Sequence, residues 1–287
     1  MKRKIIKLGK ATFVASLPSK WIRKHNLEKG DYLEVEEKES QLVIGCDKQE
    51  IIRKFSLDIR NSNTKLVANN LEVLYDLGYG EIEIIHKNNL KQYRQGRDVN
   101  SSQFIQKIVN NRLIGIEIVE QSDKRTLIKD LGGIREDSAQ QVFNRILFLI
   151  KNMISTSYDV LKSEDIEKLK SIHSQSENIR KFTVYYNRLL SVGNHEENEF
   201  KVRIKLALHL NNIRSAYGVI TKETLMTKKF YSPEALRFLD KINDHVYSVF
   251  KLCLKFDQEK ALDNYDNRER IWQDLKEIKP KKNDYLL

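Results

Sequence analysis

The first 47 residues of the chain carry clear strand and turn signals, but they are too few to bury a hydrophobic core alone. Apolar and β-branched runs at 5–8 and 12–17 predict two short strands separated by Gly9. Pro18 ends the second strand, because proline lacks the amide hydrogen that a strand ladder needs. This stretch therefore predicts a small unit that cannot fold without a partner.

A helix and a second pair of strands complete the same unit. Ser19 is expected to cap a helix over residues 20–24. Gly30 predicts a turn, since glycine readily adopts a positive φ. Alternating residues at 32–36 predict a half-buried strand, and 41–44 is its expected partner.

Positive charge is concentrated at the start of the chain. Residues 1–24 contain eight lysines or arginines and no carboxylate, whereas acidic residues begin at Glu28. The whole chain has a net charge of +11. Such an ordered basic face favours a polyanion, above all DNA. The alternative is a solvated strand and helix surface.

This unit resembles the AbrB/MazE/SpoVT domain, especially its archaeal version. The resemblance rests on Leu8-Gly9, on Val14-Ala15-Ser16-Leu17-Pro18 with Trp21, and on Gly30-Asp31 followed by Leu33-Glu34-Val35. It implies a swapped-hairpin β-barrel, in which two chains interleave into a homodimer that suits a roughly palindromic site in double-stranded DNA. By the family's pattern the candidate DNA contacts are strand and helix cations, in which lysine suits phosphate and arginine suits base edges. They are Lys2, Arg3, Lys4, Lys7, Lys10, Lys20, Arg23 and Lys24.

Residues 48–131 predict a small α+β middle domain. Helical spacing of apolar residues over 64–77 and 102–113 predicts two helices among four strands, in the order βαβαββ. The polar stretch 87–98 is typical of a mobile loop. No glycine loop for phosphate or dinucleotide follows a strand here, so the domain is expected to be a spacer or a support for dimerisation.

Residues 132–287 predict an antiparallel helical bundle, which makes the chain a multidomain α+β protein. Apolar residues recur with a helical period from about residue 137 onward. Ser163 is expected to cap the second helix, and Pro233 to begin the fourth. Residues 258–276 predict a fifth helix.

This bundle resembles PhoU-type proteins. The resemblance rests on Glu177 through Leu190, which is similar to the family's pattern "DExxDRxYxLxxRxL", and on Ala207 through Tyr217, which is similar to "ARxLERIADHA". Parts of the middle domain, "LYDLGYGEIEI" and "VEQSDKRTLIKDL", and the N-terminal unit also resemble archaeal PhoU-like regulators. The resemblance therefore covers nearly the whole chain, in order, and implies a link to phosphate uptake.

The PhoU-type metal clusters are not preserved. Arg180 stands at an acidic position of the first segment, and Asn211 and Ser215 stand at acidic positions of the second. We therefore expect no metal at these positions and no cofactor. A ligand or partner protein could contact the remaining polar residues instead, and the alternative is a solvated basic helix face. These residues are Glu177, Arg180, Lys181 and Arg188.

Several classes of protein are not expected. Cys46 and Cys253 have neither a CxxC partner nor a nearby histidine pair, which argues against a disulfide framework or structural zinc and fits a reducing cytoplasm. No apolar run is long enough for a membrane span, and the basic start does not match a signal peptide. No nucleophile, metal or nucleotide motif of an enzyme is present.

Two hypotheses remain for the function. The first is a dimeric transcriptional regulator, in which the N-terminal unit binds DNA and the bundle senses phosphate status or binds a signalling partner. The second is a PhoU-like signalling adaptor that binds a phosphate transporter or kinase, with the N-terminal unit serving only dimerisation.

Overall fold

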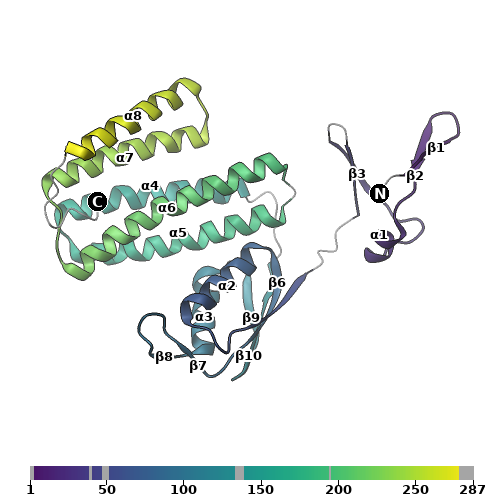
Figure 1. Ribbon diagram of the computed structural model, residues 1–287, viewed down its shortest axis with the longest axis horizontal. Helices are drawn as coiled ribbons and strands as arrows, with labels where there is room; N and C mark the ends of the chain where they lie inside the picture. The colour runs from purple at the N-terminus through teal and green to yellow at the C-terminus, as the bar shows by residue number, and fades with distance from the viewer. Residues whose placement is uncertain (1–2, 39–40, 47–51, 133–138, 194, 278–287) are drawn as a thin grey trace. The chain divides into compact units, whose positions relative to one another are not determined.

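The computed structural model describes residues 3–38, 41–46, 52–132, 139–193 and 195–277 of an α+β protein (Figure 1). The chain divides into two compact units, Met1–Ile52 and Arg53–Leu287. We describe each unit by itself.

The first unit consists of two separate hairpins and a short helix. β1 (Ile5–Leu8) pairs antiparallel with β2 (Thr12–Ala15), and Gly9 begins the turn between them with φ +73°. α1 (Ser19–Lys24) follows, and then β3 (Glu34–Lys38) pairs antiparallel with β4 (Gln41–Gly45). Within the described part of one chain, neither two-stranded sheet closes into a barrel.

The helix α1 begins differently from the sequence prediction. Pro18, not Ser19, is the N-cap residue, and it makes no side-chain capping bond. Ser19 is the first helical residue, because the Pro18 carbonyl already accepts the amide hydrogens of Trp21 and Ile22 at 2.9 and 3.1 Å. The extended φ and ψ of Pro18 (−67° and 124°) fit a strand end that leads directly into a helix.

This unit has no buried core within a single chain. None of the side chains whose exposure is described in residues 3–46 is buried. Leu8 and Phe13 of the first hairpin are 63% and 66% exposed, and Leu42 of the second is 67% exposed. Apolar side chains therefore lie open on both hairpins, as expected for a unit too small to bury them alone.

A four-stranded sheet covered by two helices opens the second unit. β5 (Arg53–Asp58) lies parallel to β6 (Tyr79–Ile85), and β10 (Arg125–Asp130) pairs antiparallel with β6 and with β9 (Ile116–Gln121). The order across the sheet is β5-β6-β10-β9. α2 (Thr64–Asp76) and α3 (Ser101–Arg112) connect these strands, so the sheet and its two helices follow the predicted order βαβαββ, with two further short strands between β6 and α3.

The prediction of a loop over residues 87–98 was wrong in part. β7 (Asn89–Lys91) pairs antiparallel with β8 (Asp98–Asn100), and Lys91 forms a bridge with Asn63. Leu90 is buried and attaches this hairpin to the core around α2 and α3. One apolar side chain among polar neighbours gives no strand period, so the sequence pattern did not indicate the hairpin.

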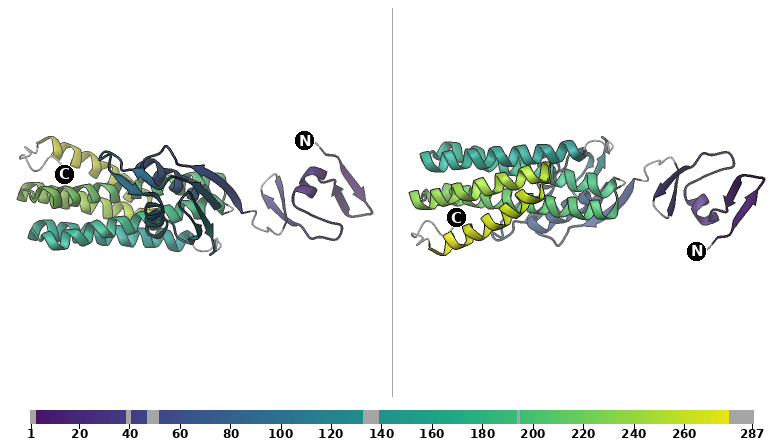
Figure 2. Two further views of the ribbon diagram at one scale, coloured as in Figure 1. Left: turned by 90° about the horizontal axis from the view of Figure 1, so that it is seen from below. Right: turned by 90° about the horizontal axis from the view of Figure 1, so that it is seen from above.

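The five long helices α4 to α8 lie side by side, with successive helices running in opposite directions (Figures 1 and 2). They are α4 (Ala139–Ser163), α5 (Ile166–Val192), α6 (Glu197–Thr227), α7 (Pro233–Leu254) and α8 (Gln258–Glu277). The predicted cap at Ser163 was wrong, because Asp165 accepts the Lys168 amide hydrogen at the start of α5. Ser232 caps α7 and Pro233 begins it, as predicted.

The bundle and the α+β layer share one unit because α5 packs on α2 and α3. These two helices lie between the sheet and α5 (Figure 1). Val184 of α5 belongs to the same buried cluster as Leu71 of α2 and Ile105 of α3. The helix α5 is therefore shared by two cores, since its other face packs on α4 and α6.

Candidate functional site

The candidate DNA contacts that are described lie exposed on the first hairpin and on α1. Lys7 is paired with Phe13 across β1 and β2, and Lys10 lies in the turn. Lys20 and Lys24 are one helical turn apart on α1, so their side chains share a face. Arg3, Lys4 and Arg23 are also exposed, whereas Lys2 lies outside the described residues. Since residues 1–24 hold no carboxylate, no neighbour in that stretch neutralises these charges.

A second group of charges lies where α5 faces α2 and α3. Glu72 of α2 accepts a hydrogen bond from Arg112 of α3 at 2.6 Å and from Arg180 of α5 at 2.7 Å. The Glu72 side chain is only 13% exposed. One carboxylate is thus shared by two guanidinium groups, which leaves an excess of positive charge beside it.

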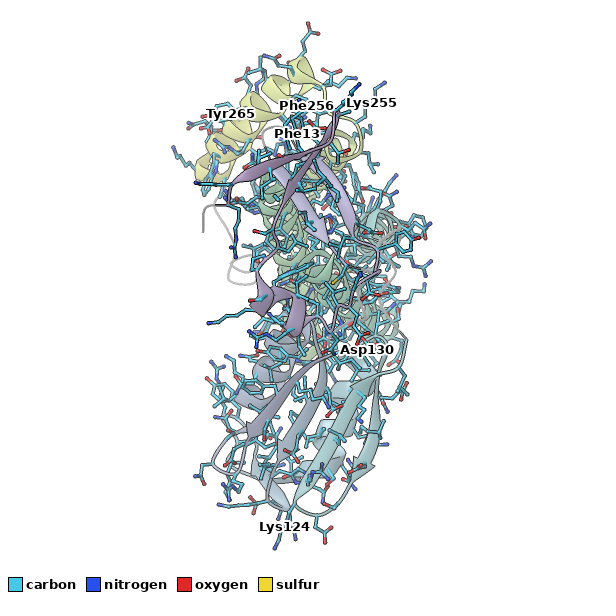
Figure 3. The ribbon with its side chains drawn as sticks, turned by 90° about the vertical axis from the view of Figure 1, so that its right-hand side faces the viewer. Phe13, Lys124, Asp130, Lys255, Phe256 and Tyr265 are labelled. Carbon is cyan, nitrogen blue, oxygen red and sulfur yellow. The ribbon has the colours of Figure 1, made fainter. Side chains whose placement is uncertain are left out.

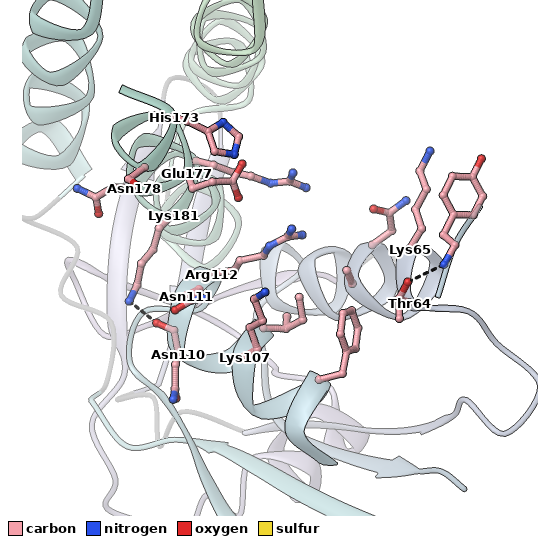
Figure 4. A pocket seen from close by; sticks show the side chains of 17 residues that line it. Thr64, Lys65, Lys107, Asn110, Asn111, Arg112, His173, Glu177, Asn178 and Lys181 are labelled. Atoms are coloured by element: carbon pink, nitrogen blue, oxygen red, sulfur yellow. Dashed lines mark hydrogen bonds between the residues drawn. The ribbon is translucent and has the colours of Figure 1, made fainter. Parts of the chain in front are cut away.

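A cavity of about 880 Å³ opens next to this cluster (Figure 4). Figure 4 shows Lys65 and Lys107 reaching toward it from α2 and α3, and His173 and Glu177 from α5. Lys181 donates to the Asn110 carbonyl at 2.8 Å across the same interface. Three of the four ligand candidates from the sequence, Glu177, Arg180 and Lys181, line this cavity.

The fourth candidate, Arg188, is not available for a ligand. Its side chain is buried between α5 and the α+β layer, and its guanidinium donates to the carbonyls of Tyr75 and Tyr79 at 2.8 and 2.9 Å. It also pairs with Asp130 at 2.7 Å, at the end of β10 labelled in Figure 3. Arg188 was expected to contact a ligand or partner, but its donors are already used to hold two layers of the fold together.

Asp76 lies beside this arginine at the end of α2. Its Oδ2 is 3.5 Å from the Asn187 side-chain amide, and its Oδ1 has no hydrogen-bond partner among the described residues. Burial raises the pKa of the Asp76 carboxyl from its ordinary 3.8 to about 7, although the hydrogen bond from Asn187 acts in the opposite direction. The contact of α2 with α5 therefore contains a carboxyl group that exchanges its proton near neutral pH.

The described residues offer no group of three or more metal-binding side chains arranged to hold an ion. On α7, His245 is close to the Asn267 amide of α8, and burial lowers the pKa of its imidazole. Cys46 and Cys253 are both free thiols. Within the ranges that the structure covers, no helix is long and apolar enough to cross a bilayer.

The sequence did not indicate the residues of α2 and α3 that meet α5 at this site. Glu72 pairs with Arg180, and Lys107 and Arg112 line the cavity; all three come from the segment that was expected to be a spacer or a support for dimerisation. Each looks like an ordinary solvated helix residue, because only the packing of α5 brings them together. The sequence feature that could have indicated a polar site here is the run Asn110-Asn111-Arg112, which ends a helix whose face is otherwise apolar.

The chain matches no family model, no curated protein and no solved structure.

Proposed function

We propose that the protein is a dimeric, DNA-binding transcriptional regulator. The observation that supports this most is the exposed row of cations on the first hairpin and α1, in a stretch without carboxylates. Phosphate contacts from such a row supply affinity for duplex DNA. The resemblance to the AbrB/MazE/SpoVT domain supplies the arrangement, in which two copies interleave into one barrel.

The proposed link to phosphate uptake rests on the resemblance of the bundle to PhoU-type proteins. In this proposal the bundle is the input region and the N-terminal unit is the output region. The alternative is an adaptor that binds a transporter or kinase, and the exposed apolar residues of the N-terminal unit favour dimerisation in either case. Loss of DNA binding without loss of the cellular role would support the adaptor.

The dimer should form through the N-terminal unit. We expect the full chain to sediment at twice its mass of 33.8 kDa, and Phe13→Asp to shift it to a monomer. A charge at this apolar site would have to be buried in the dimer, which weakens association by roughly 100-fold or more. Analytical ultracentrifugation measures both states.

Phe256→Asp is the matched control, because Phe256 is 76% exposed but lies between α7 and α8 in the second unit. This variant should remain a dimer. A monomer with Phe256→Asp and a dimer with Phe13→Asp would contradict the proposed interface.

Duplex binding should depend steeply on salt. A dimer that makes about six phosphate contacts loses roughly 10³-fold in affinity between 50 and 200 mM salt, because bound counterions are released. Fluorescence anisotropy with labelled duplex DNA from the region upstream of the protein's own coding sequence measures this slope. An affinity that is absent, or that does not change with salt, would exclude DNA binding by this row of cations.

A further inference from the structure

The cavity between α2, α3 and α5 carries a surplus of positive charge. Five cations line it, and Glu177 is the one carboxylate among the lining residues. Glu72 lies behind two of these cations, so the local excess falls to three. The cations are Lys65, Lys107, Arg112, Arg180 and Lys181.

A buried arginine adds to this surplus from the bundle side. Arg214 of α6 is 7% exposed and donates to Ser176 at 3.0 Å and to Asn211 at 3.0 Å, both neutral partners. Burial lowers the pKa of the Arg214 guanidinium, and the positive charge of Arg180 lowers it next. Arg214 does not line the cavity, but its positive charge and that of Arg180 repel each other, although Glu177 and Glu72 act in the opposite direction. An anion in the cavity would offset that repulsion.

The cavity differs from end to end. At the start of α2, the Tyr93 amide donates to Thr64, and the Lys65 ammonium lies 4.9 Å from the centre of the Tyr93 ring. Phe104 lines the cavity near the start of α3. Glu72 lies eight residues after Thr64 on α2, and Arg112 lies eight residues after Phe104 on α3. Eight residues of an α-helix span about 12 Å. Aromatic rings therefore lie at one end of the cavity and guanidinium groups at the other.

One polar atom of the lining is left without a partner. The Nδ1 of His173 on α5 is buried and has no hydrogen-bond partner among the described residues. Buried polar atoms in folded proteins are nearly always satisfied by protein, water or ligand. This nitrogen is therefore consistent with a polar ligand in the cavity.

We propose that the cavity binds a nucleotide, with its phosphate groups at the end formed by Arg112, Arg180 and Lys181 and its base toward Tyr93 and Phe104. The volume falls in the range of small-molecule sites, and it exceeds what inorganic phosphate fills. The asparagine amides along the lining can pair with the ring edges and sugar hydroxyls. This site lies wholly in the second unit and does not depend on whether the first unit binds DNA.

Isothermal titration calorimetry of the full chain with ATP, GTP, AMP and GMP tests this site. At least one nucleotide should bind once per chain in the micromolar range. Inorganic phosphate and the free nucleoside should each bind roughly tenfold or more weakly, because each reaches only one end of the cavity. Failure of all four nucleotides to bind below about 1 mM, or phosphate binding as tightly as the best nucleotide, would overturn the proposal.

Paired variants locate the binding. Lys107→Gln combined with Lys181→Gln should weaken nucleotide binding roughly tenfold, because two of the five cations that line the cavity are removed while the pairs of Glu72 remain. Tyr93→Leu should weaken it at the other end. Lys170→Gln, on the exposed part of α5, and Lys7→Gln, in the first unit, should leave it unchanged. If Lys7→Gln lowered nucleotide affinity as much as the Lys107→Gln, Lys181→Gln change, the nucleotide would bind to the basic N-terminal unit, and the assignment would be overturned.

The same variants separate this site from the proposed DNA-binding function. Without nucleotide, the Lys107→Gln, Lys181→Gln protein should bind duplex DNA as the natural chain does. Failure of DNA binding in both proteins would contradict the proposed function but leave the nucleotide result standing.

Discussion

Replacing Arg188 by methionine is expected to lower the free energy of unfolding of the Arg53–Leu287 unit by about 3–5 kcal/mol. The guanidinium pairs with Asp130 and donates to the carbonyls of Tyr75 and Tyr79, and it lies 4.6 Å from the centre of the Tyr75 ring. Methionine preserves much of the apolar stem, but it leaves the Asp130 carboxylate without its cationic partner and removes one donor from each of the two carbonyls. Urea unfolding followed by circular dichroism measures the change.

Arg270→Met is the matched control for this variant. Arg270 is exposed on α8, so its replacement should change stability by less than about 0.5 kcal/mol. Arg188→Lys should fall between the two, because a lysine retains the charge but cannot reach three acceptors at once. A loss below about 1 kcal/mol in Arg188→Met would contradict the view that this arginine fastens the bundle to the α+β layer.

Arg180 lines the cavity and Arg188 is buried, and the sequence does not predict this difference. The two residues are eight positions apart, so they lie on the same face of α5, and a helical pattern treats them alike. What covers that face changes along the helix. The end of α2 packs on Arg188 and buries it, whereas the start of α2 leaves a cavity beside His173 and Glu177. Only the packing of helices far apart in sequence separates these two roles.

Periodicity predicted the long elements well. The stripes over 64–77 and 102–113 correspond to α2 and α3, and Ser232-Pro233 begins α7 as predicted. Boundaries set by single side chains were less certain, as the caps at Pro18 and Asp165 show. These errors arise because tertiary contacts, and not the local pattern alone, decide which of two neighbouring residues becomes the cap of a helix.

Cations of the N-terminal unit and of the cavity differ in a way that composition does not reveal. In the cavity, Arg112 and Arg180 are partly buried and share the carboxylate of Glu72, so they are fixed in place and suited to a defined ligand. On the hairpin and α1, the described cations are exposed and lie in a stretch without carboxylates, which suits the many equivalent phosphates of a duplex. The net charge of +11 therefore combines two kinds of positive site.

Reversing three charges of the N-terminal unit should abolish duplex binding. Lys7→Glu, Lys10→Glu and Arg23→Glu together alter six sites in the proposed dimer, and all three side chains are exposed. Each lost phosphate contact lowers the slope of affinity against salt by about one, and repulsion adds to this loss. The affinity at about 100 mM salt should fall roughly 10³-fold or more, as measured by anisotropy.

The control carries the same change in charge on the second unit. Lys205→Glu, Lys222→Glu and Arg270→Glu replace exposed residues of α6 and α8 with the same three residue types. If this protein retains full affinity, total charge is not what binds DNA, and the contacts belong to the first hairpin and α1. An equal loss in both proteins would instead mean that affinity follows net charge alone. If the N-terminal variant loses DNA binding but keeps its cellular role, the adaptor hypothesis is favoured, because dimerisation through the apolar side chains does not need these cations.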